Sequence, residues 1–486
     1  MAERLRSLSE GQMVLLGGDR VVRVDAQLAA AFNDGDRLLV AGDELLHVPA
    51  TEAAISRQAV DAALTAFTGL ASCSDEQIDA FFAGFASRLA DVEVADALRS
   101  ANESDVVAAR ERGRATTRLI LDDRMLADMI TGLEMWRDLP GARDAVVSTV
   151  DHPGWSIDVR RAPLGVVGFV FEGRPNVFAD AAGVVRTGNT AVLRIGSDAL
   201  GTAQAIVTHA LAPALKSAGL PPGTVTLVES AAHAAGWALF ADDRLSLAVA
   251  RGSGPAVDQL GSIARSAGVP ASLHGTGGAW MIVAPDADRA RLTSVIGASL
   301  DRKVCNTLNV CCVPREQAEA LLPAVIAGAA RAGRDRDTTT IIHMDDEVRA
   351  LVASAADLDA IVAAPMPDGG LGVEWEWDAT PEFTLIVVDD IADAVDRCNR
   401  HSPHFVVSVV TDNPDTVAEV YRSVDAPFVG DGFTRWVDGQ YALSEPELGL
   451  SNWEHGRLLG RGGVLTGASV HTLRLVARFA DAGITR

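Results

Sequence analysis

The chain of 486 residues is long enough for two large domains or about three average ones. Apolar residues make up 48% of it and charged residues 22%, which indicates a globular protein with a packed core and excludes a mainly disordered chain. The formal net charge of −23 repels phosphate backbones and anionic lipid surfaces, so neither a nucleic-acid nor a membrane partner is expected.

Neither a membrane span nor a metal site is predicted. No apolar run reaches the roughly 18 residues that a span requires, and the opening MAERLRSLSEGQM lacks the apolar segment of a signal peptide. Five cysteines are too few for a disulfide framework at this length, and no CxxC or HExxH pattern is present. We therefore expect a cytoplasmic protein that binds no metal.

The first part of the chain predicts a β-rich segment followed by helices. Residues 1–48 alternate short apolar runs with glycine and aspartate turns, as in a small β-rich appendage. Residues 52–138 carry apolar side chains at three- and four-residue spacing, with Ser74 and Asp75 as candidate helix caps. Residues 145–161 predict a two-stranded ribbon, which either pairs with another subunit or forms a local hairpin.

The rest of the chain alternates strands and helices. From residue 165 this alternation predicts βαβ units and a mostly parallel sheet, and a second α/β stretch is expected from Ser272 to about Phe428. The terminal SVHTLRLVARF predicts a last strand that pairs with the ribbon. The predicted parts of the chain are therefore 1–48, 49–271, 272–435 and 436–486.

The segment FEGRPN (171–176) follows a predicted strand of the buried type. Pro175 is a common first residue of a helix, and Asn176 beside a helix start can offer its side-chain N–H₂ to a developing oxyanion. The alternative is a turn asparagine that satisfies only the backbone, and this fragment alone favours that alternative.

Cys305 is the candidate nucleophile. It lies between a predicted helix and a predicted strand and follows Arg302 and Lys303, and nearby cations lower the pKa of a thiol toward the reactive thiolate. The alternative is a small buried apolar side chain, the commonest role of a cysteine without a disulfide. The other four cysteines fit this alternative, since they lie within predicted strands or helices: Cys73, Cys311, Cys312 and Cys398.

Three glycine-containing loops follow predicted strands, at 194–198, 251–254 and 274–278. Glycines at the ends of parallel strands let backbone N–H groups approach a phosphate. They also close ordinary turns, and none of these loops matches GxGxxG or GxxxxGKS. Three such loops, two with an arginine, favour a nucleotide ligand. His274 is a candidate acid, base or pocket wall, although a lone histidine is more often structural.

Taken in chain order, these segments resemble the γ-glutamyl phosphate reductase (glutamate-5-semialdehyde dehydrogenase) family of the aldehyde dehydrogenase superfamily. The longest similar stretch is APLGVVGFVFEGRPNVFADAAGVVRTGNTAVLRIGSDAL, and ANESDVVAARERG, GLPPGTVTLV and VCNTLN occur in the family's order. The resemblance covers about residues 60–486. It implies an α/β fold with a Rossmann-like cofactor domain over 49–271, an α/β catalytic domain over 272–435, and a β-ribbon oligomerisation arm completed by 436–486.

The resemblance also implies a reaction. A cysteine attacks an acyl phosphate, by default γ-glutamyl phosphate, phosphate leaves, and hydride from NADPH reduces the thioester to the aldehyde. By position, Cys305 is the nucleophile and Asn176 the oxyanion donor, and Arg174 and Asn306 lie on the substrate side. The residues expected to bind the cofactor are Arg194, Gly196, Ser197, Asp198, Arg251, Gly252 and Ser253.

Two details of the resemblance bear on mechanism and cofactor. His274 stands where hydrolytic aldehyde dehydrogenases carry a water-activating glutamate, so hydrolysis of a thioester should be poor. Arg194 and Ser197 favour NADP if they meet a 2′-phosphate, whereas Asp198 favours NAD if it bonds the ribose diol. The arm implies a homodimer or homotetramer.

Departures from the family leave other readings open. The family's lysine ahead of the cysteine is missing, and Trp280, Phe405 and Val406 introduce apolar side chains where the family borders its substrate. A different acyl phosphate, an acyl-coenzyme A or an aldehyde from specialised metabolism is therefore an alternative substrate. A non-catalytic scaffold is a third reading, and the retention of Cys305 and Asn176 argues against it. Residues 1–48 have no counterpart in the family.

Overall fold

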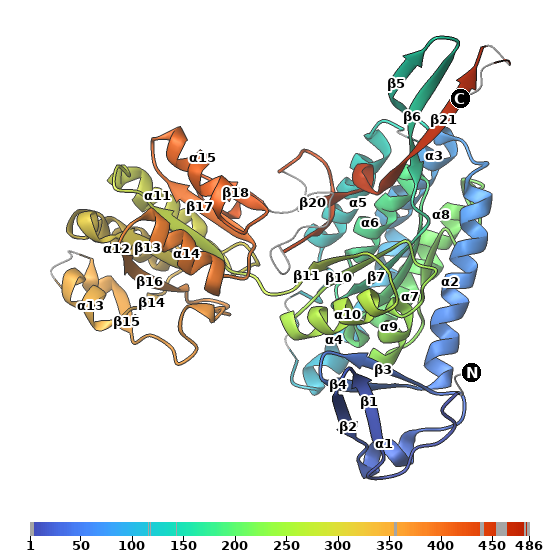
Figure 1. The fold of residues 1–486 in the computed structure, drawn as a ribbon, viewed down its shortest axis with the longest axis horizontal. Coiled ribbons are helices and arrows are strands. Elements are labelled where there is room, and N and C mark those ends of the chain that lie inside the picture. The colour runs from blue at the N-terminus through green and yellow to red at the C-terminus, as the bar shows by residue number, and fades with distance from the viewer. Residues whose placement is uncertain are drawn as a thin grey trace. The chain divides into compact units, whose positions relative to one another are not determined.

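The computed structural model describes residues 4–114, 116, 118–141, 143–353, 357–437, 442–452, 464–480 and 483. They form two compact units, each with its own parallel sheet (Figure 1). The first unit takes in the described residues of Met1–Gly275, Glu445–Leu450 and Val464–Arg486. The second takes in those of Thr276–Ser444 and Ser451–Gly463.

The first unit begins with an appendage of two small hairpins and one short helix. Its elements are β1 (Met13–Gly17), β2 (Arg20–Arg23), α1 (Ala26–Ala31), β3 (Arg37–Ala41) and β4 (Glu44–Val48). Leu8, Val24 and Phe32 bury one another in a core of their own. Ala41 and Leu46 instead join the core beneath the main sheet, which attaches the second hairpin to the unit.

Four long helices follow, and their capping residues explain where they begin. Ser74 caps α3 as predicted: its Oγ accepts the Gln77 N–H at 3.3 Å, and Gln77 Oε1 accepts the Ser74 N–H at 3.0 Å. Asp91 ends α3 and caps α4, so the continuous helical pattern divides there. The four helices are α2 (Ala50–Leu70), α3 (Asp75–Ala90), α4 (Val92–Glu111) and α5 (Asp123–Asp138).

A five-stranded parallel sheet forms the centre of the first unit, in the order β11-β10-β7-β8-β9. Its strands are apolar on both faces, as expected when helices cover both. Val166 and Val170 face the core that includes α2, α9 and α10, while Val167 and Phe169 face the core that includes α3 to α8. The strands are β7 (Val166–Phe171), β8 (Thr190–Ile195), β9 (Val225–Leu227), β10 (Leu247–Arg251) and β11 (Ala271–His274).

Short helices connect these strands. A single π-helical turn, Val207–Leu211, joins α7 to α8 within the segment predicted as one helix. The helices are α6 (Val177–Ala181), α7 (Leu200–Ile206), α8 (Ala212–Ser217), α9 (His233–Phe240) and α10 (Gly254–Ser266). Two strands from the end of the chain, β19 (Glu447–Leu450) and β20 (Val464–Thr466), pair with each other in the same unit.

The first unit ends later than the sequence predicts. The segment around Ser272 was expected to open the catalytic domain, but β11 pairs in parallel with β10 and completes the first sheet. Leu273 is buried in the same core as Leu260 of α10. The boundary therefore falls after Gly275.

The second unit is a seven-stranded parallel sheet in the order β15-β14-β16-β13-β12-β17-β18. Met281 and Cys311 face the core under α11, α12 and α13, and Trp280 and Cys312 face the core under α14 and α15. The strands are β12 (Ala279–Val283), β13 (Leu308–Pro314), β14 (Thr340–His343), β15 (Ile361–Ala364), β16 (Glu382–Val388), β17 (Val406–Val410) and β18 (Phe428–Gly430). The helices are α11 (Arg289–Ser299), α12 (Ala318–Arg334), α13 (Asp346–Val352), α14 (Ile391–His401) and α15 (Pro414–Ser423).

An arm of three antiparallel strands projects from the first unit at the end opposite the appendage (Figure 1). It consists of β5 (Val146–His152), β6 (Trp155–Pro163) and β21 (His471–Phe479). β21 pairs with β6 along its whole length, from His471 opposite Pro163 to Phe479 opposite Trp155, which is the pairing that the sequence predicts.

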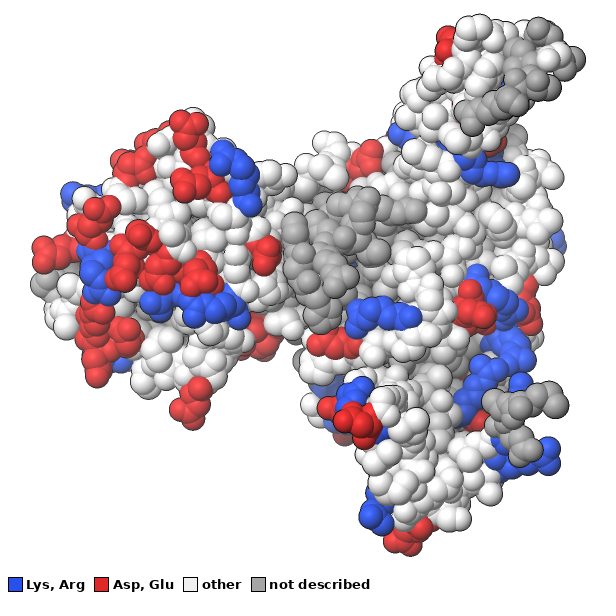
Figure 2. Space-filling view, in the orientation of Figure 1, with Lys and Arg blue, Asp and Glu red and all other residues white. Residues whose placement is uncertain are grey.

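The charge of the chain is unevenly distributed. Figure 2 shows acidic side chains gathered on the displayed face of the second unit, with only scattered basic ones among them. A polyanion would be repelled from that face. Within the described ranges, no helix is long and apolar enough to cross a membrane.

Candidate active site

The strand order of the first unit reverses at β7. The chain passes from β7 outward to β8 and β9, and then returns to place β10 and β11 on the other side of β7. Loops diverge at such a reversal, and ligands of open parallel sheets bind there. The Glu172 N–H donates to the Arg251 carbonyl at 3.2 Å, so the loops after β7 and β10 begin side by side.

Charged side chains lie in and beside the loops after β7 and β10. Arg174 Nη2 donates to Glu172 Oε2 at 3.1 Å, and Arg251 Nη1 lies 3.6 Å from Asp180 Oδ2 on α6. Burial raises the pKa of Asp180 to about 6, against the opposing effect of the Arg251 and Arg174 charges. The sequence pattern did not single out Glu172 or Asp180, although both belong to the longest stretch similar to the reductase family.

Asn176 precedes α6 with its side chain uncommitted to the helix. Its backbone is helical, and the side chain makes no capping bond. Its Oδ1 is buried and accepts no hydrogen bond from the described part of the chain. The Asn176 side chain therefore does not cap α6. The turn asparagine of the alternative interpretation would instead use its side chain to satisfy the backbone.

The loop after β8 lies against the loop after β7 and requires a glycine. A Cβ on Gly196 would stand 2.6 Å from the Gly173 nitrogen, so no other residue fits without backbone movement. Arg194 is buried and donates from Nη2 to the Ala231 carbonyl at 3.1 Å. Ser197 and Asp198 then begin the turn that leads into α7.

Two arginines at the end of α4 surround this turn, and the sequence pattern did not identify them. Arg112 Nη2 lies 2.8 Å from Asp198 Oδ1, and Arg114 Nη1 lies 2.6 Å from Asp198 Oδ2 and 3.4 Å from Ser197 Oγ. Burial, with Arg194 and Arg114 nearby, lowers the pKa of His233 on α9. Both oxygens of Asp198 are thus paired with arginines.

The loop after β10 leads into the start of α10. Ser253 precedes α10 without making a side-chain capping bond, so the first N–H groups of this 13-residue helix are available to an anion. The Gly252 N–H donates to the His274 carbonyl at 3.2 Å, which brings the ends of β10 and β11 together. A glycine cradle, an uncapped helix start and nearby arginines together fit a dinucleotide.

In the second unit, Cys305 occupies a half-buried loop between α11 and β13. Its carbonyl accepts the Gly278 N–H at 2.7 Å, and Thr307 Oγ1 accepts the Val304 N–H at 2.9 Å and donates to the Arg302 carbonyl at 2.7 Å. These hydrogen bonds fix the loop on both sides of Cys305, which lies outside any helix or strand.

Asn306 lies in the interior of the second unit. It is fully buried, and its Nδ2 donates to the Val437 carbonyl. The predicted contact of Asn306 with substrate stays a prediction, since the observed bond uses its amide to tie the Cys305 loop to the segment after β18.

Lys303 does not act on Cys305 as an isolated cation. Its Nζ lies 2.8 Å from Glu374 Oε1 and 3.4 Å from Glu376 Oε1, and its side chain is almost entirely buried. Two carboxylates therefore offset the positive charge of Lys303 beside Cys305. The candidate residues thus divide between the units: Cys305 and Asn306 lie in the second, and Arg174, Asn176, Arg194, Gly196, Ser197, Asp198, Arg251, Gly252, Ser253 and His274 lie in the first.

Residues 39–357, which include Asn176, His274 and Cys305, match the aldehyde dehydrogenase family. The chain belongs to this family. It is 31% identical over 372 residues to the γ-glutamyl phosphate reductase of Moorella thermoacetica, a match covering 74% of this chain and 83% of that protein. The predicted resemblance is confirmed, and the chain is an oxidoreductase of the aldehyde dehydrogenase superfamily.

Solved structures support the fold. The crystal structure of γ-glutamyl phosphate reductase from Thermotoga maritima matches with a TM-score of 0.77 at 24% identity, covering 89% of this chain and 100% of that one. An engineered glycolyl-CoA reductase with bound NADP⁺ matches with a TM-score of 0.59 at 16% identity, covering 88% and 98%. The predicted aldehyde dehydrogenase-like α/β fold is confirmed, and membership of the family supports a nicotinamide dinucleotide as cofactor.

The remaining cysteines of this aldehyde dehydrogenase family member are poor nucleophiles. Burial raises the pKa of Cys311 and Cys312 far above the ordinary range, and that of Cys398 to about 12. Cys73 is partly buried and donates from Sγ to the Gly69 carbonyl at 3.7 Å. The reading of these four as small packed side chains agrees with their burial.

The three apolar residues at which the sequence departs from the reductase family are buried within the second unit. Trp280 is fully buried on β12 and packs in the core under α14 and α15. Phe405 meets the Phe428 ring edge-on at 5.3 Å, and Val406 is buried on β17. All three side chains are therefore buried within the second unit, and the different acyl group that they suggest stays a prediction.

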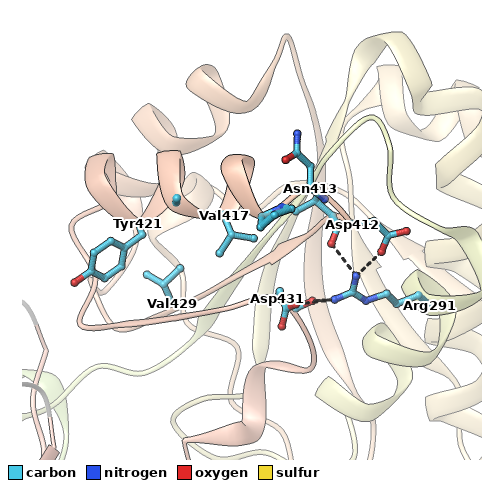
Figure 3. Close-up of a pocket in the computed structure, with 10 residues that line it drawn as sticks. Arg291, Asp412, Asn413, Val417, Tyr421, Val429 and Asp431 are labelled. Carbon is cyan, nitrogen blue, oxygen red and sulfur yellow. Dashed lines mark hydrogen bonds and ion pairs between the residues drawn. The ribbon is translucent and has the colours of Figure 1, made fainter.

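A pocket of about 540 Å³ on the second unit lies apart from the candidate nucleophile, beside α15 (Figure 3). Arg291 lines this pocket and donates hydrogen bonds to Asp412 Oδ1 at 2.7 Å and to Asp431 Oδ2 at 3.0 Å (Figure 3). Its guanidinium is committed to these carboxylates and to two backbone carbonyls, so it holds loops together rather than attracting an anion. No residue predicted for catalysis lines this pocket. In the described ranges, no cluster of His, Cys, Asp and Glu could hold a metal ion.

Proposed function

We propose that this protein reduces γ-glutamyl phosphate to glutamate 5-semialdehyde with NADPH, through a thioester on Cys305, as in proline biosynthesis. The observation that carries the proposal is the 31% identity to a γ-glutamyl phosphate reductase over 83% of that protein's length. The half-buried Cys305 and the uncommitted amide of Asn176 supply the two groups that the chemistry needs. We expect the protein to act in the cytoplasm, where an acyl phosphate and NADPH are available to it.

The proposed reaction begins when the Cys305 thiolate attacks the acyl carbon. We assign to the Asn176 side chain the hydrogen bond that stabilises the resulting oxyanion. The bond from carbon to the phosphate oxygen breaks, inorganic phosphate leaves, and a thioester remains on Sγ. When bound, NADPH would supply the hydride that reduces the thioester carbon. The carbon–sulfur bond then breaks, which releases the aldehyde and restores Cys305.

His274 supports transfer between acyl groups and phosphate rather than to water. His274 is the last residue of β11. It occupies the position at which hydrolytic relatives carry a water-activating glutamate. Without a carboxylate base at this position, a thioester should persist long enough to react with phosphate or hydride.

The reverse reaction tests the proposed function. Purified protein is mixed with glutamate 5-semialdehyde and NADP⁺, and reduced nicotinamide is followed by absorbance with inorganic phosphate, with coenzyme A, or with neither. We expect sustained turnover only with phosphate. Sustained turnover with coenzyme A alone, or equal turnover without any acceptor, would contradict the acyl-phosphate assignment.

The cationic cluster at the end of α4 supports NADP as the preferred cofactor. Asp198 would favour the unmodified ribose of NAD, but both of its oxygens are paired with Arg112 and Arg114. Arg114 also lies beside Ser197 Oγ. We infer that the 2′-phosphate binds among these groups, where two arginines and a hydroxyl replace the diol contact.

Replacing Arg114 with alanine should weaken NADP⁺ far more than NAD⁺. Loss of a charge-assisted bond to the 2′-phosphate raises KM for NADP⁺ roughly tenfold to a hundredfold, while KM for NAD⁺ changes little. Steady-state kinetics with both cofactors measure this ratio. Arg110→Ala, which removes an exposed arginine from the last turn of α4, is the matched control. A similar increase in KM for both cofactors would place the 2′-phosphate elsewhere.

The arm supports a homodimer or homotetramer. β5 and β21 are edge strands, and apolar side chains stand exposed along them, among them Val147, Val150, Leu475 and Phe479. We expect Leu475→Arg to shift the protein to monomers in light scattering coupled to size-exclusion chromatography. Leu15→Arg, an equally exposed leucine of the appendage, should leave the mass unchanged. A monomeric wild-type protein would rule out self-association through the arm.

A further inference from the structure

Glu374 joins the two loops that meet behind Cys305. Its Oε2 accepts the Gly277 N–H at 2.9 Å, and its Oε1 accepts Lys303 Nζ at 2.8 Å. Gly277 belongs to the loop that leads into β12, and Lys303 to the loop that carries Cys305. One carboxylate therefore connects both segments that frame the thiol.

The carboxylate and the backbone of Cys305 both lie beside Gly277. A Cβ placed on Gly277 would stand 2.7 Å from the Cys305 Cα and 2.8 Å from Glu374 Oε1. Both groups therefore crowd the same point, and only a glycine fits there. An uncompensated negative charge this close to a thiol disfavours the thiolate.

Glu374 is held rigidly by its neighbours in the chain. Asn309 Nδ2 donates to the Val373 carbonyl at 2.8 Å, and the Trp375 N–H donates to Asn309 Oδ1 at 2.9 Å. The Trp375 ring stacks on His343 at 3.7 Å between centroids. Both flanking residues are therefore anchored, which fixes the backbone from which the Glu374 side chain extends.

We propose that Lys303 and Glu374 are positioning residues. Their ion pair fixes the backbone around Cys305, and the positive charge of Lys303 neutralises the Glu374 carboxylate near the Cys305 thiol. The pair has the burial that such a role needs, because the Lys303 side chain is 6% exposed and that of Glu374 20% exposed. Low solvent exposure makes each charge effective on its neighbour, and removal of one partner leaves the other unbalanced. The inference rests on the proposed role of Cys305 as the nucleophile.

Other charged side chains of the second unit lie in or near the Cys305 loop. Arg302 is exposed, Glu376 is largely exposed, and Asp301 pairs with Arg435 at 2.7 Å. Water screens the exposed groups, and the ion pair is neutral overall. Lys303 and Glu374 are therefore the two charges whose removal should be felt most strongly at the thiol.

The test is the pH dependence of Cys305 alkylation by iodoacetamide, read at this residue by peptide mass spectrometry. In Glu374→Gln the remaining oxygen still accepts the Gly277 N–H while Lys303 loses its partner, so the alkylation midpoint should fall by about one pH unit. In Lys303→Met the carboxylate is uncompensated, so the midpoint should rise by about one unit. The double variant should return toward wild type.

Controls separate charge balance from folding and from the proposed function. Lys303→Arg should keep the wild-type midpoint, and Lys216→Met, which removes the only other lysine, should leave it unchanged. The proposal is overturned if Glu374→Gln raises the midpoint or leaves it in place, even if Lys303→Met fails to fold. If Cys305→Ala remains active, the proposed function fails. If that variant is inactive while the midpoints do not move, only this inference fails.

Discussion

Replacing Cys305 with alanine is expected to lower kcat on the order of 10⁴-fold or more, because the thioester can no longer form. Alanine is the better choice than serine, since a hydroxyl could retain weak nucleophilic activity. Dinucleotide binding should persist. The cofactor candidates lie in the first unit, which has hydrophobic clusters of its own, whereas Cys305 lies in the second. Turnover of glutamate 5-semialdehyde with phosphate gives kcat, and titration calorimetry with NADP⁺ gives the dissociation constant.

A matched variant distinguishes the nucleophile from a general need for thiols. Cys73→Ala removes the other cysteine that is not fully buried, and it should retain nearly wild-type kcat. If Cys305→Ala keeps more than a small fraction of activity, the covalent mechanism is wrong. If it loses dinucleotide binding as well, its inactivity reflects damage to the fold rather than loss of the nucleophile.

Local signals in the sequence account for much of the fold. The Ser74 cap is correct because a capping box is made by residues three apart, and both partners are visible in the chain. The strands of both sheets are recognisable as apolar runs because parallel sheets are covered on both faces. The pairing of β21 with β6 follows from two ribbon-like segments that lack another partner in the pattern.

The site was less predictable where it depends on distant residues. Lys303 was correctly placed beside Cys305, but its partner Glu374 is 71 positions further along the chain and belongs to no recognisable motif. Arg114 likewise meets Asp198 from 84 positions away. Charge effects fall off with distance in space, not in sequence, so a list of neighbouring residues cannot give the sign of the local field.

Side-chain direction was also hard to predict from the sequence. Trp280 was interpreted as part of a changed pocket because it occupies a segment that borders the substrate in the reductase family. On β12, however, alternate residues face opposite layers, and Trp280 shares the core of Ile282 rather than the surface. A shift of one residue in register would have reversed that outcome, which is why position in a motif alone does not define a pocket.

The carboxyl edge of the first sheet explains why the predicted cofactor loops are spread over the sequence. The loops after β7, β8 and β10 meet where the strand order reverses, so Gly196 and Gly252 both lie beside the loop that holds Glu172. Each glycine was a weak signal by itself. Parallel pairing brings the carboxyl ends of neighbouring strands together, which turns three separate loops into one binding edge.

Replacing Asn176 with alanine is expected to lower kcat by about 10²- to 10³-fold with little change in the KM for substrate. The donor acts on the oxygen charge that develops as the tetrahedral intermediate forms and is absent from the bound substrate, so its loss affects the chemical step more than binding. The fold should tolerate the change, because the Asn176 side chain makes no capping bond to α6. Steady-state turnover in the phosphate-dependent reverse reaction measures both constants, and thermal unfolding monitors the fold.

Two further variants decide whether Asn176 acts as a donor. Asn176→Asp keeps the shape but places a negative charge where the oxyanion forms, so it should be at least as slow as the alanine variant. Asn33→Ala, which removes an exposed asparagine from the appendage, should leave kcat unchanged. An increase in KM with an unchanged kcat in Asn176→Ala would show that the amide binds the ground state. Asn176 would then be a substrate-binding group, and the oxyanion would have to be stabilised by backbone N–H groups instead.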